Sequence, residues 1–141
     1  RAFVVGFAVY IVTTLFTSIP IANVGLVILL TFLTAFLFSI AGFINAVYAK
    51  SFDDINIVTT FVLTPLTYLG GTFYSIASLP QVWQDISVFN PIVYIISSYR
   101  LAFLGVEETS LVLSLSVIIS LIIILFVTAL MLLSRGTGIK N

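Results

Sequence analysis

The stretch PQVWQDISVFNPIVYIISSYRLAFLGV, residues 80–106, decides how this chain folds. Pro80 and Pro91 each suit the first turn of a helix, because that position needs no amide hydrogen. Asn90 stands directly before Pro91 and is a favourable N-cap residue. Residues 80–89 are amphipathic, with apolar side chains on one face and polar ones elsewhere. The pattern predicts two short helices with a break at Asn90.

The second of these helices is too short to cross a membrane. It covers residues 91–104 and is apolar except for Arg100. At about 1.5 Å per residue it reaches about 21 Å, whereas the hydrocarbon core is about 30 Å thick. We therefore predict a re-entrant helical pair over 80–104 that enters a membrane and returns to the same side. The alternative is a full crossing over 88–106.

Outside this stretch, three long runs carry no charged residue: 2–49, 55–84 and 109–134. A crossing takes about 20 apolar residues, so the first run is long enough for two crossings. It should break near Pro20, which cannot donate a backbone hydrogen bond. We predict an all-α integral membrane fold, one transmembrane domain over residues 1–141, with four transmembrane helices at about 2–19, 24–49, 55–79 and 110–134.

The composition of the 141 residues supports a membrane protein. Hydrophobic residues make up 61% and charged residues 7%, against about 25% charged in soluble domains. There is no basic patch, so we expect no nucleic-acid partner. There is no His and no Cys, which removes common metal ligands and the usual catalytic triads. Residue 1 is Arg, so we expect a fragment of a longer protein.

The basic residues predict an orientation through the positive-inside rule. With a re-entrant pair, four of the five basic residues fall on one side, which we take as cytoplasmic: Arg1, Lys50, Arg135 and Lys140. A fifth full crossing would move Arg135 and Lys140 to the other side. Both ends of the chain are therefore expected to be cytoplasmic.

Several residues of the predicted helices are candidates for a function. Pro65, Gly70 and Gly71 predict a kink or local unwinding of the third crossing, and form a candidate hinge or pathway lining. A kink that only improves packing is the alternative. Arg100 is ionisable near membrane depth and so is a functional candidate. Its alternative is snorkelling or pairing with a nearby carboxylate, from Asp85, Glu107 or Glu108.

The remaining acidic residues and the aromatic residues have simpler interpretations. Asp53 and Asp54 begin a helix, where carboxylates cap amides and complement the helix dipole; a metal or proton site is the alternative. Glu107 and Glu108 are adjacent and do not share a helix face, so we expect no catalytic residue and no metal site. Interface aromatics are expected at Trp83, Tyr94 and Tyr99, with substrate contact as the alternative. A small-residue face that should pack on another helix comprises Ala35, Ser39, Gly42 and Ala46.

The chain resembles a known family of membrane proteins over its whole length. The segment FVLTPLTYLGGTFYS at 61–75 is followed by Leu79-Pro80, Trp83, Asn90-Pro91-Ile-Val-Tyr94, Arg100 and Phe103-Leu-Gly105. Lys50-Ser-Phe-Asp-Asp54 precedes the third crossing, and Arg135-Gly-Thr-Gly follows the last. This series is similar to the permeases of ABC-2-type ATP-binding-cassette exporters, and most similar to the bacterial inner-membrane branch.

The resemblance implies a six-helix permease with a re-entrant pair before the last helix, of which this chain is the C-terminal part. It implies export driven by ATP hydrolysis on a separate ABC ATPase subunit, which would hold ATP and Mg, so the chain itself needs no cofactor. It also implies a second permease subunit, in a homodimer. A candidate extracellular gate would comprise Asn90, Pro91 and Arg100. A candidate ATPase-facing loop would comprise Phe52, Asp53 and Asp54.

Two other classes of function are compatible with the residues. An ion-coupled secondary transporter or channel also uses broken and re-entrant helices, but it usually carries an intramembrane carboxylate, and the four predicted crossings have none. A membrane scaffold without transport is compatible with the composition, although a re-entrant pair would then have no evident purpose. The transported substrate is not indicated by the sequence.

Overall fold

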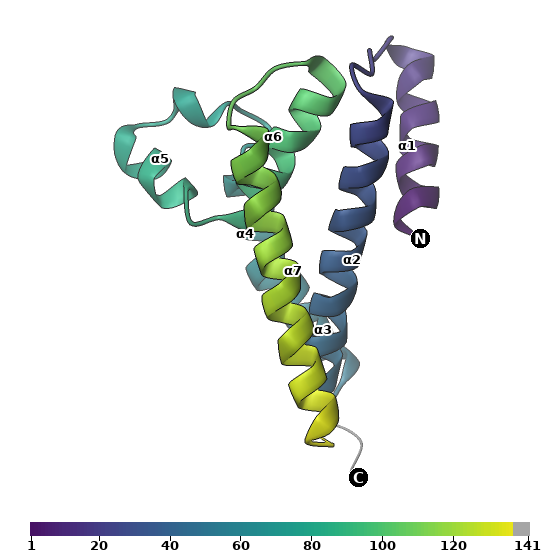
Figure 1. The fold of residues 1–141 in the computed structure, drawn as a ribbon, viewed down its shortest axis with the longest axis vertical. Coiled ribbons are helices and arrows are strands. Elements are labelled where there is room, and N and C mark those ends of the chain that lie inside the picture. Colours follow the sequence, from purple (N-terminus) through teal and green to yellow (C-terminus); the bar gives the residue numbers. More distant parts are fainter. Residues whose placement is uncertain (137–141) are drawn as a thin grey trace.

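The computed structural model describes residues 1–136, and these form helices and connecting turns without any strand (Figure 1). The predicted cytoplasmic position of Lys140 lies outside the described residues. The elements in chain order are α1 (Ala2–Phe16), α2 (Val24–Tyr48), α3 (Phe52–Val58), the π-helix η1 (Thr59–Leu63), α4 (Thr64–Leu69), the 3₁₀ helix η2 (Ile76–Ser78), α5 (Gln81–Ser87), α6 (Pro91–Leu104) and α7 (Leu111–Ser134).

Within residues 1–136, two helices are long and apolar enough to cross a membrane, namely α2 with 25 residues and α7 with 24. The pair α5 and α6 adds a third candidate span if it is counted as one, but it is bent by 92° and is not a straight rod. α1 has 15 residues and ends at Phe16, three residues before the predicted end. It ends there because Thr17, its C-cap, is extended.

The third predicted crossing differs most from the sequence-based prediction. We expected a helix over 55–79, but the helical run starts at Phe52 and ends at Leu69. Pro65 cannot donate a hydrogen bond to the turn before it, and the helix widens there into η1. Gly71 then adopts a left-handed φ of 85°, which is open to glycine and stops the helix. The two glycines therefore end the helix rather than kink its interior.

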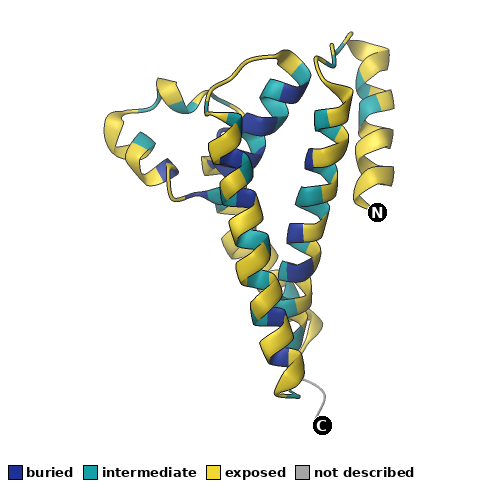
Figure 2. Ribbon diagram, viewed as in Figure 1, coloured by how far each residue is buried: buried dark blue, intermediate teal, exposed yellow. Residues whose placement is uncertain are grey.

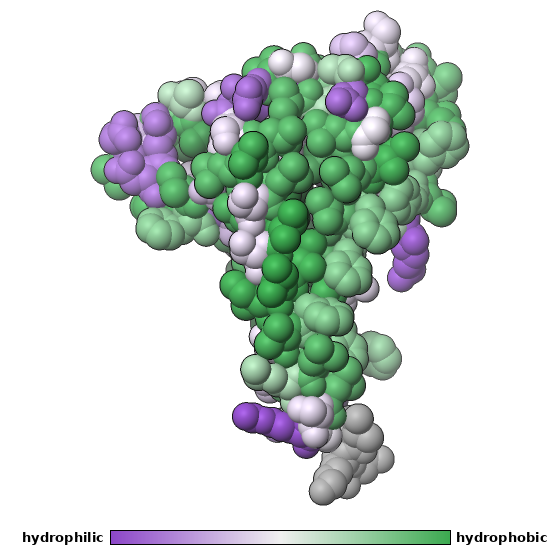
Figure 3. Space-filling view, in the orientation of Figure 1, coloured by the Kyte–Doolittle hydropathy of each residue, from purple (hydrophilic) through white to green (hydrophobic). Residues whose placement is uncertain are grey.

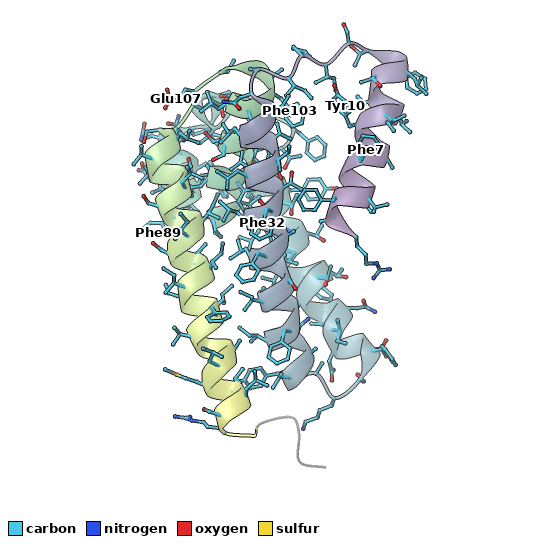
Figure 4. All side chains as sticks on the ribbon, turned by 45° about the vertical axis from the view of Figure 1, so that its right-hand side comes forward. Phe7, Tyr10, Phe32, Phe89, Phe103 and Glu107 are labelled. Carbon is cyan, nitrogen blue, oxygen red and sulfur yellow. The ribbon has the colours of Figure 1, made fainter. Side chains whose placement is uncertain are left out.

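The apolar core lies between α2, α6 and α7. Leu30, Ala102 and Ile118 are fully buried, one on each of these helices. Figure 2 shows the buried residues on the facing sides of these helices, whereas α1 is exposed along most of its length. α1 lies beside α2, and its Tyr10 points toward Phe103 of α6 with ring centroids 6.4 Å apart (Figure 4).

The C-terminal end of α6 is fixed to the start of α2. At its C-terminal end, the carbonyls of Phe103 and Ala102 accept hydrogen bonds from the amides of Ala22 and Asn23, at 3.1 and 2.9 Å. The end of α6 therefore lies beside the start of α2. Since 14 residues of α6 span about 21 Å and 25 residues of α2 span about 37 Å, α6 reaches only part of the way along α2.

The small-residue face of α2 is not packed within the described residues. Ser39, Gly42 and Ala46 are exposed, and a Cβ added at Gly42 would have no atom within 4 Å. The side of α2 that packs on α6 and α7 carries Leu30 and Leu37 instead, so the expected close packing is absent from this part of the chain.

Candidate functional site

Sequence-predicted residues from two separate groups meet where the end of α4 packs on the start of α6. We call this place the clamp, and define it as Asn90, Arg100 and Glu108 together with the backbone carbonyls that Asn90 and Arg100 hold. Gly70 and Gly71 of the hinge candidates belong to the same contact. Pro65 lies in the first turn of α4, before the clamp.

Asn90 joins α4 to α6 through both ends of its side-chain amide. Its Oδ1 accepts a hydrogen bond from the amide of Ile92 at 3.0 Å, which caps α6 as the sequence predicts. Its Nδ2 donates to the carbonyl of Leu66 at 2.8 Å. That carbonyl belongs to the last turn of α4, where helical carbonyls lack intrahelical partners. Asn90 is buried, so both bonds replace contacts with water or lipid.

Gly70 allows the close approach of the two helices at this point. A Cβ added there would lie 2.7 Å from Cγ2 of Ile92 and 3.1 Å from the carbonyl oxygen of Leu66. Pro91 is the first residue of α6, where its missing amide hydrogen costs no intrahelical bond. The hinge candidate Gly70 and the gate candidates Asn90 and Pro91 therefore form one contact.

Arg100 holds three segments together. Its Nη1 donates to both carboxylate oxygens of Glu108, at 2.9 and 2.8 Å. Its Nη2 donates to the carbonyl oxygen of Gly71 and, at 3.2 Å, to that of Tyr74. The side chains of Arg100 and Glu108 are only 22% and 27% exposed. Of the pairing partners considered for Arg100, the structure selects Glu108.

Neighbouring acidic residues serve different elements. Ser75 donates to Glu108 Oε1 at 3.3 Å, so the same carboxylate also holds the connection after α4. Glu107 accepts from the amide of Leu111 at 3.2 Å and caps the start of α7. Asp85 accepts from Gln81 at 2.9 Å within α5. Glu107 and Asp85 stabilise local structure, whereas Glu108 joins separate segments, and the three carboxylates do not converge on one point.

The residues at the start of α3 divide into helix-capping residues and residues that could contact a partner. The Asp54 carboxylate accepts from the amides of Lys50 and Ser51 at 2.9 and 3.0 Å, and Ser51 caps the amide of Asp54. These hydrogen bonds, first that from Lys50, lower the pKa of Asp54 below its ordinary value. Asp54 is therefore a capping residue. Phe52, 88% exposed, and Asp53 remain as the residues of this turn that could meet a partner.

Sequence reasoning missed parts of the clamp. It singled out Arg100 and Asn90 but not the backbone carbonyls that they hold, because those partners depend on where α4 ends. The pair Gly70-Gly71 is itself a helix C-terminus signal, since glycine is the usual residue after a helix. Read in that way, it would have predicted free carbonyls near residue 66 and a need for buried donors.

The long apolar helices are those of an integral membrane protein, and comparisons give its family. The chain matches the ABC-2 type transporter family over residues 1–104 and belongs to it. It is 45% identical over all 141 residues to the inner membrane transport permease YadH of Escherichia coli (strain K12), covering 55% of that relative.

A more distant relative is nodulation protein J of Rhizobium leguminosarum bv. viciae, 28% identical over 103 residues, which are 73% of this chain and 40% of that protein. The chain spans about half the length of the YadH relatives that it matches. No solved structure matches it. Family membership and the apolar helices together show that the chain is a membrane-integral component of the ABC-2 type transporter family.

Proposed function

We propose that this chain is the C-terminal part of the permease subunit of an ABC-2-type exporter in a bacterial inner membrane. It would form part of the translocation pathway, and a separate ABC ATPase subunit would bind ATP and Mg and hydrolyse the nucleotide. Family membership supports this proposal and disfavours the ion-coupled alternative. A homodimeric arrangement of two permease subunits is part of the same proposal.

We propose four crossings, formed by α1, α2, the helical run that follows Asp54 as far as Leu69, and α7, with α5 and α6 as the re-entrant pair. With 15 residues α1 reaches only about 22 Å, so its assignment as a crossing rests on family membership and not on its length. The bond between the end of α6 and the start of α2 supports this arrangement, because it keeps the end of α6 on the side where α2 begins. The 92° bend and the short reach of α6 support it further. In this topology both ends of the fragment are cytoplasmic.

The clamp is the single observation that carries the mechanistic part of the proposal. It closes the space between the third crossing and the re-entrant pair on the extracellular side. Its bonds join separate elements through side chains, so they can open without unfolding any helix. We therefore assign Asn90, Pro91 and Arg100 to an extracellular gate that parts from Gly70 and Gly71 during transport.

A continuous helical run connects this gate to the other end of the molecule. It starts at the exposed Phe52 and ends at Leu69, with η1 in its middle. Near its start, Asn45 of α2 donates to the carbonyl of Ile55 at 3.3 Å. We assign the Phe52–Asp53 edge to contact with the ATPase, and Pro65 with η1 to the hinge that passes its movement on.

The first test is co-purification of the full-length permease with the ATPase encoded beside it, followed by ATP hydrolysis in liposomes. We expect a stable complex whose hydrolysis depends on the permease. The double change Phe52→Ser and Asp53→Asn should weaken the complex without unfolding the permease, because neither side chain is part of the capping box. Val106→Ser, at the opposite end and 50% exposed, is the matched control.

Two outcomes would contradict these assignments. If no ATPase associates with the full-length permease, the exporter proposal is wrong. If the complex forms and the double change leaves its affinity unaltered, the ATPase contact lies elsewhere on the permease. Asp54 is kept unchanged in this design, because reversing its charge would remove the helix cap and confuse the two effects.

A further inference from the structure

An apolar cavity lies beside the clamp, between the end of α4 and α5. Its volume is about 490 Å³, within the range of about 300–1,000 Å³ typical of ligand pockets. Leu66 and Leu69 form one wall, and Trp83 and Ile86 of α5 form the opposite wall. None of its lining residues is Asp, Glu, Lys or Arg. The cavity therefore offers no partner for a charged group.

The entrance of this cavity is continuous with apolar surface. Phe89 at its edge is 89% exposed, and Ile86 and Trp83 are 51% and 49% exposed. The polar side chains of α5 are hydrogen-bonded within the protein: Gln81 donates to Asp85, Gln84 donates to the carbonyl of Leu79, and Ser87, which lines the cavity, donates to the carbonyl of Trp83. Figure 3 shows hydrophilic atoms gathered at the outer edge of the protruding α5 region, next to a hydrophobic surface.

This distribution is that of an amphipathic helix at a membrane surface, with the cavity beneath it on the hydrocarbon side. α5 lies near the end of the molecule that holds the α1–α2 and α6–α7 connections (Figure 1). The polar groups of the lining already donate hydrogen bonds within the protein, Tyr74 to Tyr68, Ser87 to Trp83 and Asn90 to Leu66, so water finds few partners in this largely apolar cavity. In a bilayer, the apolar group that is present at high concentration beside such a cavity is a lipid acyl chain.

We propose that an acyl chain of a bilayer phospholipid occupies this cavity and supports the closed clamp. Leu66 provides the link, because it lines the cavity, packs against the apolar core and accepts the hydrogen bond of Asn90 at its carbonyl. Asn90 lines the same cavity at its inner end. A chain in the cavity therefore supports the wall on which the α4–α6 contact rests. The role assigned to the clamp rests on the proposed function, whereas occupancy requires only that the protein lies in a bilayer.

Trp83 gives a direct test, since it is the only tryptophan in these 141 residues and lines the cavity. The full-length permease is placed in bilayers containing phospholipids brominated on their acyl chains, which quench tryptophan on contact. Signal from tryptophans elsewhere is subtracted with a Trp83→Phe variant. An Ile124→Trp variant, at a position of α7 that is 59% exposed, gives the quenching expected from bulk lipid.

We expect Trp83 to be quenched more strongly than the Ile124→Trp reporter at every content of brominated lipid. The change Ile86→Phe, which fills the cavity, should abolish this excess. Val82→Phe makes a similar change on the same helix at an exposed position outside the cavity, and should leave the excess intact.

The inference would be overturned if Trp83 and the Ile124→Trp reporter were quenched equally. It would also be overturned if the excess quenching of Trp83 survived Ile86→Phe, or if Val82→Phe removed it as well. Saturable quenching by a soluble brominated detergent, without excess quenching by brominated phospholipid, would also overturn it, because the occupant would then be another amphiphile. The measurement involves neither ATP nor an ATPase, so failure of the exporter proposal would leave its result unaffected.

Discussion

Replacing Arg100 tests whether the clamp is more than one ion pair. Its guanidinium donates to Glu108 and also to the carbonyls of Gly71 and Tyr74. Arg100→Gln removes all of these bonds and leaves the Glu108 carboxylate without its cation. Glu108→Gln removes only the negative charge, keeps a side-chain oxygen as acceptor, and leaves both carbonyl contacts in place. Arg100→Gln should therefore lower the free energy of unfolding more than Glu108→Gln does.

The difference can be estimated from the exposure of the pair. Removing one partner of a fully buried pair costs about 3–5 kcal/mol, and exposed pairs contribute about 0.2–1 kcal/mol. With 22% and 27% exposure, we place Arg100→Gln near the lower end of the buried range, at about 3 kcal/mol. Glu108→Gln keeps the hydrogen bonds from Arg100 to the carbonyls of Gly71 and Tyr74, which contribute about 1 kcal/mol each, so it should cost about 2 kcal/mol less, that is about 1 kcal/mol.

The free energies of unfolding of the full-length variants can be compared by titration with sodium dodecyl sulfate in mixed micelles. A difference of about 2 kcal/mol is about a 30-fold change in the ratio of folded to unfolded protein, which such a titration resolves. Arg100→Lys is the matched control, because it keeps the charge but lacks the planar fork that reaches several acceptors. Equal destabilisation by Arg100→Gln and Glu108→Gln would refute the reasoning, since the carbonyl contacts would then contribute nothing.

Two further predictions concern the ends of the third helical run. Gly70→Ala should destabilise the permease by about 1–3 kcal/mol through overpacking against Ile92, whereas Gly42→Ala should be neutral or slightly stabilising, having no atom within 4 Å of its Cβ. If Gly70→Ala and Gly42→Ala changed the free energy of unfolding equally in the same titration, the close approach of α4 and α6 at Gly70 would be excluded. Because hydrogen bonds lower the folded-state pKa of Asp54, its contribution to stability is complete above the unfolded pKa and is lost as pH falls through the folded-state value. The stability difference between wild type and Asp54→Asn should therefore shrink in strong acid; a pH-independent difference, or an equal one for Asp53→Asn, would contradict the capping role.

The sequence predicted those parts of the fold that depend on local chemistry. Asn90 caps α6, as expected of an Asn before a Pro, and Asp54 caps α3, as expected of a carboxylate in a first turn. α2 and α7 lie within the predicted crossings because each is an uninterrupted apolar run. The family assignment is confirmed by the match over residues 1–104. Each of these conclusions needs only neighbouring residues or the order of motifs.

The end of α4 could not be predicted in the same way, because it depends on partners distant in sequence. The carbonyl of Leu66 can lack an intrahelical partner only because Asn90 donates to it from 24 residues away. The carbonyl of Gly71 likewise accepts from Arg100, 29 residues away. In lipid an unpaired carbonyl costs several kcal/mol, so a helix can end at that depth only where such donors, or the water of an open pathway, are present. A prediction based on residues 64–75 alone includes neither Asn90 nor Arg100.

The same argument locates the movement that the proposed mechanism requires. The start of the third helical run is tied to α2 by the bond from Asn45, and its end is tied to α6 by Asn90. Movement of the turn before α3 can reach α4 along the helix only through η1. In that π turn the hydroxyl of Thr64 donates to the carbonyl of Thr59, so a side chain supplements the backbone pairing. Pro65 has no amide hydrogen, so bending next to η1 breaks fewer backbone hydrogen bonds than bending elsewhere along the run. Under the proposed mechanism, a displacement that starts at the proposed ATPase-facing turn would therefore act on the clamp through α4.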